Sequence, residues 1–223
     1  MERKIVIPGE ELAEGDYKIG DGVYRDKNKL YSSVLGLLDL KEDGVRVIPL
    51  RGKYMPKLDD FVIGTIVDIE FSNWYLDINS AYSAVLNAGD YFRDIDPFQA
   101  DISKVMGIGD SIFAKIREIT PRKKVYVTMK EMGARTLNGG KLFEVTPTKV
   151  PRMIGKKGSM LSMIKKETGC NIVVGQNGMI WLDGKFELMD LATKVVKIIE
   201  EEAHTTGLTE RIKSIIIKES EKI

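Results

Sequence analysis

The chain is poor in the two residues most often used for reactive or metal-binding chemistry: among 223 residues it has one cysteine, Cys170, and one histidine, His204. A single cysteine cannot form an internal disulfide, so a cytoplasmic location is expected. His204 lies beside a predicted helix end, which favours a capping or surface role. No cluster of zinc ligands is present, and neither is a Walker-type phosphate loop.

Long apolar runs are also absent. No stretch approaches the roughly 18 apolar residues of a membrane span. The first residues lack the apolar segment of a secretory signal, so no membrane association or secretion is expected.

Neither sign of charge dominates, because 34 basic residues nearly cancel 33 acidic ones and leave a formal net charge of +1. Affinity for a phosphate backbone depends on local patches and not on this total. Residues 115–135 hold seven basic side chains against Glu118 and Glu131. Residues 149–166 hold no acidic side chain and six basic ones, Lys149, Arg152, Lys156, Lys157, Lys165 and Lys166. The two runs are compatible with nucleic acid as a partner, although basic runs are often simply solvated surface.

Residues 1–55 have the pattern of a small all-β unit. Short runs rich in β-branched and aromatic residues alternate with turn signals such as Pro8-Gly9, Gly20-Asp21-Gly22 and Asp43-Gly44. This spacing is typical of hairpins. No stretch has the apolar period of a long helix. We therefore predict an N-terminal all-β domain over these residues.

Residues 57–135 continue as strands. From Phe61 to Phe71 the side chains alternate, which predicts that one face of a strand carries Thr65, Val67, Ile69 and Phe71. Further strands are expected at 74–78, 81–86, 111–118 and 125–129, with one long irregular connection. Five strands with one long connection suit the OB-fold, a small closed barrel that commonly binds nucleic acid.

From about residue 140 the apolar period changes from two to nearly four. The expected elements are a strand near 142–146, a helix at 159–168, strands at 171–174 and 179–182, and a helix at about 185–203. This gives a β-α-α-β-β-α order over residues 140–207. Residues 208–223 are predicted to form a helical extension, which the sequence pattern does not assign to any of the three domains. The whole chain is thus expected to be a mixed β and α+β multidomain protein.

The run Ile154-Gly155-Lys156-Lys157-Gly158 carries the clearest chemistry in the sequence. Two glycines three residues apart allow a tight turn and let the backbone approach a phosphate that a Cβ would keep away. Exposed amides and the start of the next helix favour an anion, and the two lysines add charge without base preference. A lone G-x-x-G is common by chance, but here a helix, two strands and a long helix follow it.

These residues resemble a type I KH domain, through Val150 to Ile154, the loop itself, Ile164 and Thr168 to Ile172. That family clamps about four single-stranded nucleotides between the loop and an apolar groove. The resemblance implies an RNA site formed by Arg152, Ile154, Gly155, Lys156, Lys157, Gly158, Ile172 and Val174. A KH fold that serves only as a packing module is the alternative.

The middle section resembles the S1 RNA-binding domain, an OB-fold variant, through Gly64 to Ile69 and Gly109 to Ile116. That family stacks bases on aromatic residues of its second strand, beside a histidine that follows the third. Tyr75 matches one aromatic position, while Ser72 occupies the other, and an apolar residue near Val85 or Leu86 replaces the histidine. Loop residues are therefore expected to contribute as well. The predicted contacts in this section are Tyr75, Arg93, Arg122, Lys123 and Lys124.

The first section narrows the resemblance through Val6 to Glu10, Gly20 to Tyr24, Tyr31 to Gly36 and Tyr54 to Pro56. Followed by S1-like and KH-like sections, it resembles the RNA-binding cap subunits of the archaeal exosome, over residues 4–205. In that family the N-terminal domain docks on a hexameric ring of RNase PH-type subunits. Three cap subunits surround the pore and guide the 3′ ends of single-stranded RNA inward for 3′-to-5′ degradation. The implied partners are RNA and this ring, with no cofactor.

No residue pattern predicts catalysis, so we expect a protein that is not itself an enzyme. One connection holds four acidic residues without tight ligand spacing, and no metal site is expected there: Asp90, Asp94, Asp96 and Asp101. Cys170 follows a helix stop and is expected to be a small buried residue. Two other functions stay open. One is a free-standing RNA-binding regulator of transcription or translation, and the other is a structural adaptor that does not contact RNA.

Overall fold

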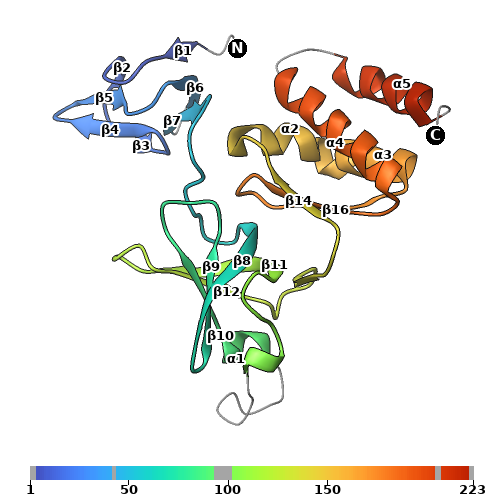
Figure 1. The fold of residues 1–223 in the computed structure, drawn as a ribbon. Coiled ribbons are helices and arrows are strands. Elements are labelled where there is room, and N and C mark those ends of the chain that lie inside the picture. Colours follow the sequence, from blue (N-terminus) through green and yellow to red (C-terminus); the bar gives the residue numbers. More distant parts are fainter. Residues whose placement is uncertain (1–3, 42–43, 93–101, 204–206, 221–223) are drawn as a thin grey trace. The chain divides into compact units, whose positions relative to one another are not determined.

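The chain folds into two compact units, Met1–Gly52 and Lys53–Ile223, in a computed structural model (Figure 1). The structure describes residues 4–41, 44–92, 102–203 and 207–220. Within these ranges no helix combines the length and the apolar character needed to cross a membrane.

The first unit is built from two small sheets, with strand orders β1-β6-β7-β3 and β2-β5-β4. Its strands are β1 (Ile5–Val6), β2 (Glu11–Glu14), β3 (Lys18–Ile19), β4 (Val23–Asp26), β5 (Lys29–Ser32), β6 (Gly36–Lys41) and β7 (Gly44–Pro49). Val6, Leu30, Val45 and Val47 are almost fully buried and form its core. The predicted N-terminal β domain is confirmed.

The second unit begins with a closed five-stranded barrel. Its strands are β8 (Phe61–Glu70), β9 (Asn73–Asp77), β10 (Ala84–Asn87), β11 (Ser111–Ile119) and β12 (Val125–Thr128). The sheet order is β12-β10-β9-β8-β11-β13, and the barrel closes because β12 also pairs with β11. The helices α1 (Ala88–Tyr91) and η1 (Ile102–Lys104) follow β10, and β13 (Arg135–Leu137) pairs with β11. Trp74, Leu76, Ile112 and Ile116 fill the interior, so the predicted OB-type barrel is confirmed.

The alternation expected along β8 is wrong in its second half. The pairing of β8 with β9 shifts register between Ile66 and Asp68. Ile66 is 1% exposed, whereas Val67 is 50% and Phe71 is 85% exposed. A β-bulge adds one residue to one strand and so reverses the face that each later side chain takes. Ile69 therefore turns inward and packs against the barrel core, while Asp68 and Glu70 on either side of it are exposed.

Tyr54 packs with the barrel, beyond the end of the first unit. Its side chain is 6% exposed, its backbone bridges to Ser80, and its hydroxyl donates a 2.7 Å hydrogen bond to the carboxylate of Asp60. Burial raises the pKa of the Asp60 carboxyl, against the opposing effect of the Tyr54 bond. The short chain segment between the two units is thus fixed to the barrel from Tyr54 onward.

A three-stranded sheet with helices on one side completes the second unit. The sheet order is β14-β16-β15, and all its pairs are antiparallel. The elements are β14 (Lys141–Glu144), η2 (Pro147–Lys149), α2 (Val150–Ile154), η3 (Lys156–Gly158), α3 (Ser159–Thr168), β15 (Asn171–Val174), β16 (Met179–Asp183), α4 (Phe186–Glu201) and α5 (Leu208–Ser220). Up to α4 this is the β-α-α-β-β-α order predicted for a type I KH domain.

Helix α5 is part of the same helical layer. Leu208, Ile212 and Ile216 lie on one face at a spacing of four residues, and all three are buried in the core formed with α3 and α4. Figure 1 shows α5 alongside α4. The sequence alone placed this extension in no unit, and the structure makes it a component of the KH core.

A buried polar turn fastens the KH sheet to the barrel. Asn177, between β15 and β16, is fully buried. Its Oδ1 accepts a 3.2 Å bond from the Ile63 amide, and its Nδ2 donates to the carbonyls of Ile63 at 2.7 Å and Ile78 at 2.8 Å. A Cβ on Gly175 would lie 2.8 Å from the Ile63 amide nitrogen, so glycine is required there for the turn to approach the barrel.

The sheet face opposite the helices is sealed against the barrel by apolar side chains. Val173 and Trp181 from the KH sheet pack with Ile63 and Leu137 from the barrel. The indole Nε1 of Trp181 also donates a 2.8 Å hydrogen bond to the carbonyl of Gly139. The barrel and the KH sheet therefore share a continuous interface within the second unit.

Candidate nucleic-acid interface

The loop between α2 and α3 has the tight conformation that its two glycines predict. Gly155 has φ 75° and ψ 177°, and a Cβ there would lie 2.8 Å from both the Cβ and the backbone nitrogen of Met160. Its amide donates a 3.0 Å bond to the Pro151 carbonyl, which closes α2. Gly158 is left-handed, with φ 79°, and nothing lies within 4 Å of the position of its missing Cβ. Only glycine fits position 155, whereas position 158 faces open space.

Positive charge collects at this loop without a counter-charge. Lys156 and Lys157 are exposed, and within the described ranges neither side chain has a hydrogen bond or an ion pair. Helix α3 begins immediately afterwards, with no side-chain cap and no acidic residue in its first turn. Its first amide groups therefore add to an electrostatic field that attracts anions. Arg152, on α2, is also exposed.

The apolar residues predicted to line the groove, on the helical side and on the strand side, differ in how exposed they are. Ile154 and Leu161 are partly buried on the helical side. Ile172 is 1% and Val174 is 8% exposed, and both belong to the KH core. Their side chains support the strand, while the accessible apolar surface next to the loop is provided by the helices.

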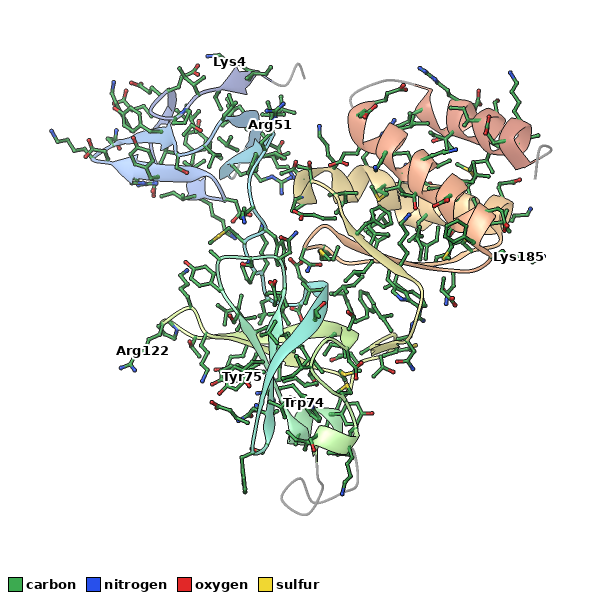
Figure 2. All side chains as sticks on the ribbon, viewed as in Figure 1. Lys4, Arg51, Trp74, Tyr75, Arg122 and Lys185 are labelled. Atoms are coloured by element: carbon green, nitrogen blue, oxygen red, sulfur yellow. The ribbon has the colours of Figure 1, made fainter. Side chains whose placement is uncertain are left out.

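The barrel presents a pair of tyrosines on its outer surface. Trp74 points into the core and is fully buried, so Tyr75 points outward (Figure 2). Tyr75 pairs with Val85 across β9 and β10, and Val85 pairs in turn with Tyr126 on β12. Side chains paired in register lie on the same face, and strands are about 4.8 Å apart, which places the two tyrosines about 10 Å apart. Tyr126 was missed in the sequence, because only the barrel closure brings β12 beside β10.

The tyrosine pair has neighbours of both charges. The Tyr75 hydroxyl donates a 2.8 Å hydrogen bond to Glu70, and this bond raises the pKa of the tyrosine. On the other side, the Lys124 ammonium lies 5.6 Å from the ring centroid of Tyr126. A lysine over an aromatic face is a favourable cation–π arrangement. The structure thus brings the predicted residues Tyr75 and Lys124 to one surface, through Tyr126.

The basic run at 115–135 divides into paired and unpaired side chains. Lys115 contacts Asp59 at 2.9 Å, and Arg117 makes two 2.8 Å bonds to the buried Asp90. Arg122 and Lys123 are exposed, and Figure 2 shows Arg122 at the end of the β11–β12 loop, away from the barrel. Two positions available to a phosphate are therefore on this loop.

Some sequence predictions fall outside the described residues: Arg93, Asp94, Asp96, Asp101 and His204. Of the acidic connection, Asp90 is described, and its carboxylate is occupied by Arg117. Within the described ranges no group of three or more acidic, histidine or cysteine side chains could hold a metal ion. The prediction that Cys170 is a small buried residue is confirmed, since it is 3% exposed.

Comparisons with known proteins agree in the family they indicate. The family described as the exosome RNA-binding protein RRP4 N-terminal domain matches residues 3–51, and a KH domain family matches residues 140–188. The exosome complex component Rrp4 of Methanothermus fervidus is 46% identical over 99% of this chain and 98% of its own. Rrp4 of Pyrococcus furiosus is 45% identical over 99% of this chain and 85% of its own.

A solved structure supports the same assignment. A crystal structure of a candidate exosome complex RNA-binding protein is 38% identical, with a TM-score of 0.69. The match covers 77% of this chain and 99% of that one.

Proposed function

Because the chain belongs to the Rrp4 family of exosome components, we propose that it is the RNA-binding cap subunit of an archaeal exosome. The membership confirms the family that the order of the three sections predicted. In this proposal the chain is not itself catalytic. It recruits single-stranded RNA and guides the 3′ end into a ring of RNase PH-type subunits for 3′-to-5′ degradation. Three copies surround the pore of the hexameric ring, and no cofactor is needed.

The Gly155–Gly158 loop carries the RNA part of the proposal. It combines two exposed lysines without a counter-charge and the uncapped first turn of α3, and it has a glycine at the one position where a Cβ would collide. Such a loop contacts phosphates and positions the strand without reading its sequence. The partly exposed Ile154 and Leu161 lie next to it, where apolar contact with a base can add to affinity.

The substitution Gly158→Asp tests this loop with little structural disturbance. It places a carboxylate beside the phosphates, while its Cβ meets no atom within 4 Å. We expect at least about tenfold weaker binding of poly(A) RNA, since a loss of about 1.4 kcal/mol is tenfold in affinity. Gly169→Asp is the matched control, because Gly169 ends the same helix with φ 65° and equally open space. Wild-type RNA affinity in the Gly158→Asp variant, with folding intact, would favour the structural adaptor.

Docking to the ring is assigned to the first unit. Ile5 and Ile7 are each 59% exposed on either side of the fully buried Val6, and Leu35 and Leu40 are 46% and 42% exposed. Exposed aliphatic side chains concentrated on a small unit are typical of a protein interaction surface. We expect Ile7→Glu to abolish co-elution with the ring in size-exclusion chromatography with light scattering, and Lys27→Glu, in the β4–β5 turn, to retain it.

Assays of RNA degradation test whether the ring, and not this chain, is catalytic. The purified chain should not degrade RNA, and its addition to the ring should increase degradation. Processive degradation by the isolated chain, with its own phosphate or metal dependence, would contradict the proposal. A chain that purifies only as a monomer and never joins the ring would favour the free-standing regulator.

A further inference from the structure

Two tyrosines flank a covered valine on the outer face of the barrel. Tyr75 on β9 pairs in register with Val85 on β10, and Val85 pairs with Tyr126 on β12. Val85 is 3% exposed, although the barrel core takes Ala84 and Leu86 from the same strand and not Val85. Side chains on the outer face therefore cover Val85, and its neighbours in register are the two tyrosines. Both tyrosines remain partly exposed, so the three residues form one accessible surface.

The two rings are held in different ways. The Tyr75 hydroxyl donates its hydrogen bond to Glu70, which fixes the orientation of that ring. This bond raises the pKa of Tyr75, and Tyr126 is among the nearby groups whose charge raises it further, as residues on one surface should. The Tyr126 hydroxyl has no hydrogen-bond partner within the described part of the chain. Its ring is instead accompanied by the Lys124 ammonium, 5.6 Å from the centroid.

Charge is distributed unevenly around the tyrosine pair. Asp68 lies opposite Tyr75 on β8, and Glu118 lies opposite Tyr126 on β11. Residues 122–124, in the loop that leads into β12, are three consecutive exposed basic side chains. The last of them precedes Tyr126 by two positions, and strand side chains two residues apart point to the same side. A phosphate backbone is therefore favoured on the loop side of the pair, next to Tyr126, and disfavoured beside Tyr75.

We propose that Tyr126 and Tyr75 stack the bases of single-stranded RNA, and that Lys124 binds a backbone phosphate beside them. The inference rests on the proposed RNA-binding function and extends it from the KH loop to the barrel, with Tyr126 as an added contact. Aromatic rings stack bases of any sequence because every base has a π-face, while basic side chains follow the backbone. The surface therefore selects unpaired strands, whose bases are free to stack on side chains.

Substitutions of Tyr126 in the full chain test the stacking role, with the affinity for fluorescently labelled poly(A) RNA measured by anisotropy. Tyr126→Leu retains apolar cover over Val85 but removes the aromatic face, and it should bind at least about fivefold more weakly. Tyr126→Phe should bind as wild type does, because the ring remains and the hydroxyl has no partner. Tyr24→Ala is the matched control, since Tyr24 is a 45% exposed strand tyrosine of the first unit, and it should retain wild-type affinity.

A second probe separates base stacking from phosphate binding. An abasic ribose-phosphate strand of the same length offers the backbone without bases, so Tyr126→Leu should bind it as tightly as wild type does. Lys124→Gln should weaken the binding of both strands and make the slope of log affinity against log salt about 0.7 less steep. Lys213→Gln, which removes an exposed charge on α5, should retain the wild-type slope.

Three outcomes would overturn the inference. Wild-type affinity for poly(A) in Tyr126→Leu, with Gly158→Asp still impaired, would overturn it and leave the proposed function standing. Equal losses for poly(A) and the abasic strand in Tyr126→Leu would exclude stacking. Loss of ring association in Tyr126→Leu without loss of RNA affinity would make the surface a protein contact. A wild-type chain that binds no RNA would overturn both the inference and the proposed function.

Discussion

At the scale of single residues, the two loop glycines differ in what surrounds them. Gly155→Ala combines a positive φ with a Cβ 2.8 Å from the backbone and Cβ of Met160, while Gly158→Ala meets only the conformational penalty. We expect losses in unfolding free energy of about 2–4 kcal/mol for Gly155→Ala and about 1 kcal/mol for Gly158→Ala. Urea unfolding followed by circular dichroism measures both. Equal losses would mean that the loop relaxes around a Cβ at position 155.

Cys170 offers a second test at this scale. Burial raises the pKa of its thiol, and the side chain is 3% exposed. Since the thiolate is the reactive form, the folded protein should react with a thiol-specific chromogenic reagent at pH 8 far more slowly than the chain in urea. The ratio of the two rates checks the prediction. Labelling of the native protein as fast as that of the denatured chain would show that this part of the KH core opens readily.

At the scale of elements, the Gly175–Gly178 turn fixes the KH sheet to the barrel. Asn177→Ala removes three hydrogen bonds to buried backbone groups of Ile63 and Ile78. Leaving such groups unsatisfied should lower the free energy of unfolding by about 2–4 kcal/mol. Gln176→Ala is the matched control, because Gln176 is exposed and only its backbone amide bonds to Phe61. Chemical denaturation of both variants should show a loss for Asn177→Ala alone.

Helix α5 should contribute to the stability of the KH core. Ile212 is fully buried against α3 and α4, so Ile212→Ala should lower the free energy of unfolding by about 2–4 kcal/mol. Lys213→Ala changes an exposed neighbour on the same helix and should have almost no effect. If the Ile212 variant were as stable as wild type, α5 would be a separable extension instead of a part of the core.

Elements with local signals were predictable from the sequence, and those set by distant contacts were not. Helix α3 has the predicted bounds because Gly158 and Gly169 stop the helix period at both ends. The bulge in β8 depends on how β9 pairs with it, and Tyr126 joins Tyr75 only through barrel closure. Asn177 lies between two strands that the sequence predicted, but its role could not be predicted, because its partners Ile63 and Ile78 are about one hundred positions away. The period of apolar residues indicates only local geometry. The bulge, the tyrosine pair and the contacts of Asn177 depend on residues far away in the sequence, so this period could not predict them.

At the scale of the whole molecule, the boundary between the two units predicts a separable RNA-binding fragment. Residues Arg51 to Lys53 are exposed, while Tyr54 is anchored in the barrel. A fragment of residues 53–223 should fold and bind poly(A) RNA as the full chain does, but it should no longer co-elute with the ring. Circular dichroism, anisotropy and light scattering check the three parts. Ring association by this fragment would move the docking surface to the second unit.

The buried turn at Asn177 also determines where the chain tolerates added residues. Hairpin turns normally accept insertions because they face solvent, but the Gly175–Gly178 turn is packed into the barrel and has no room for a longer loop. The β12–β13 loop is the opposite case, since Met132 is 93% exposed and Gly133 has open space around it. A fluorophore or an affinity tag placed at Met132 would report on the assembled protein without disturbing it, whereas the same insertion at Gln176 would separate its two nucleic-acid-binding folds.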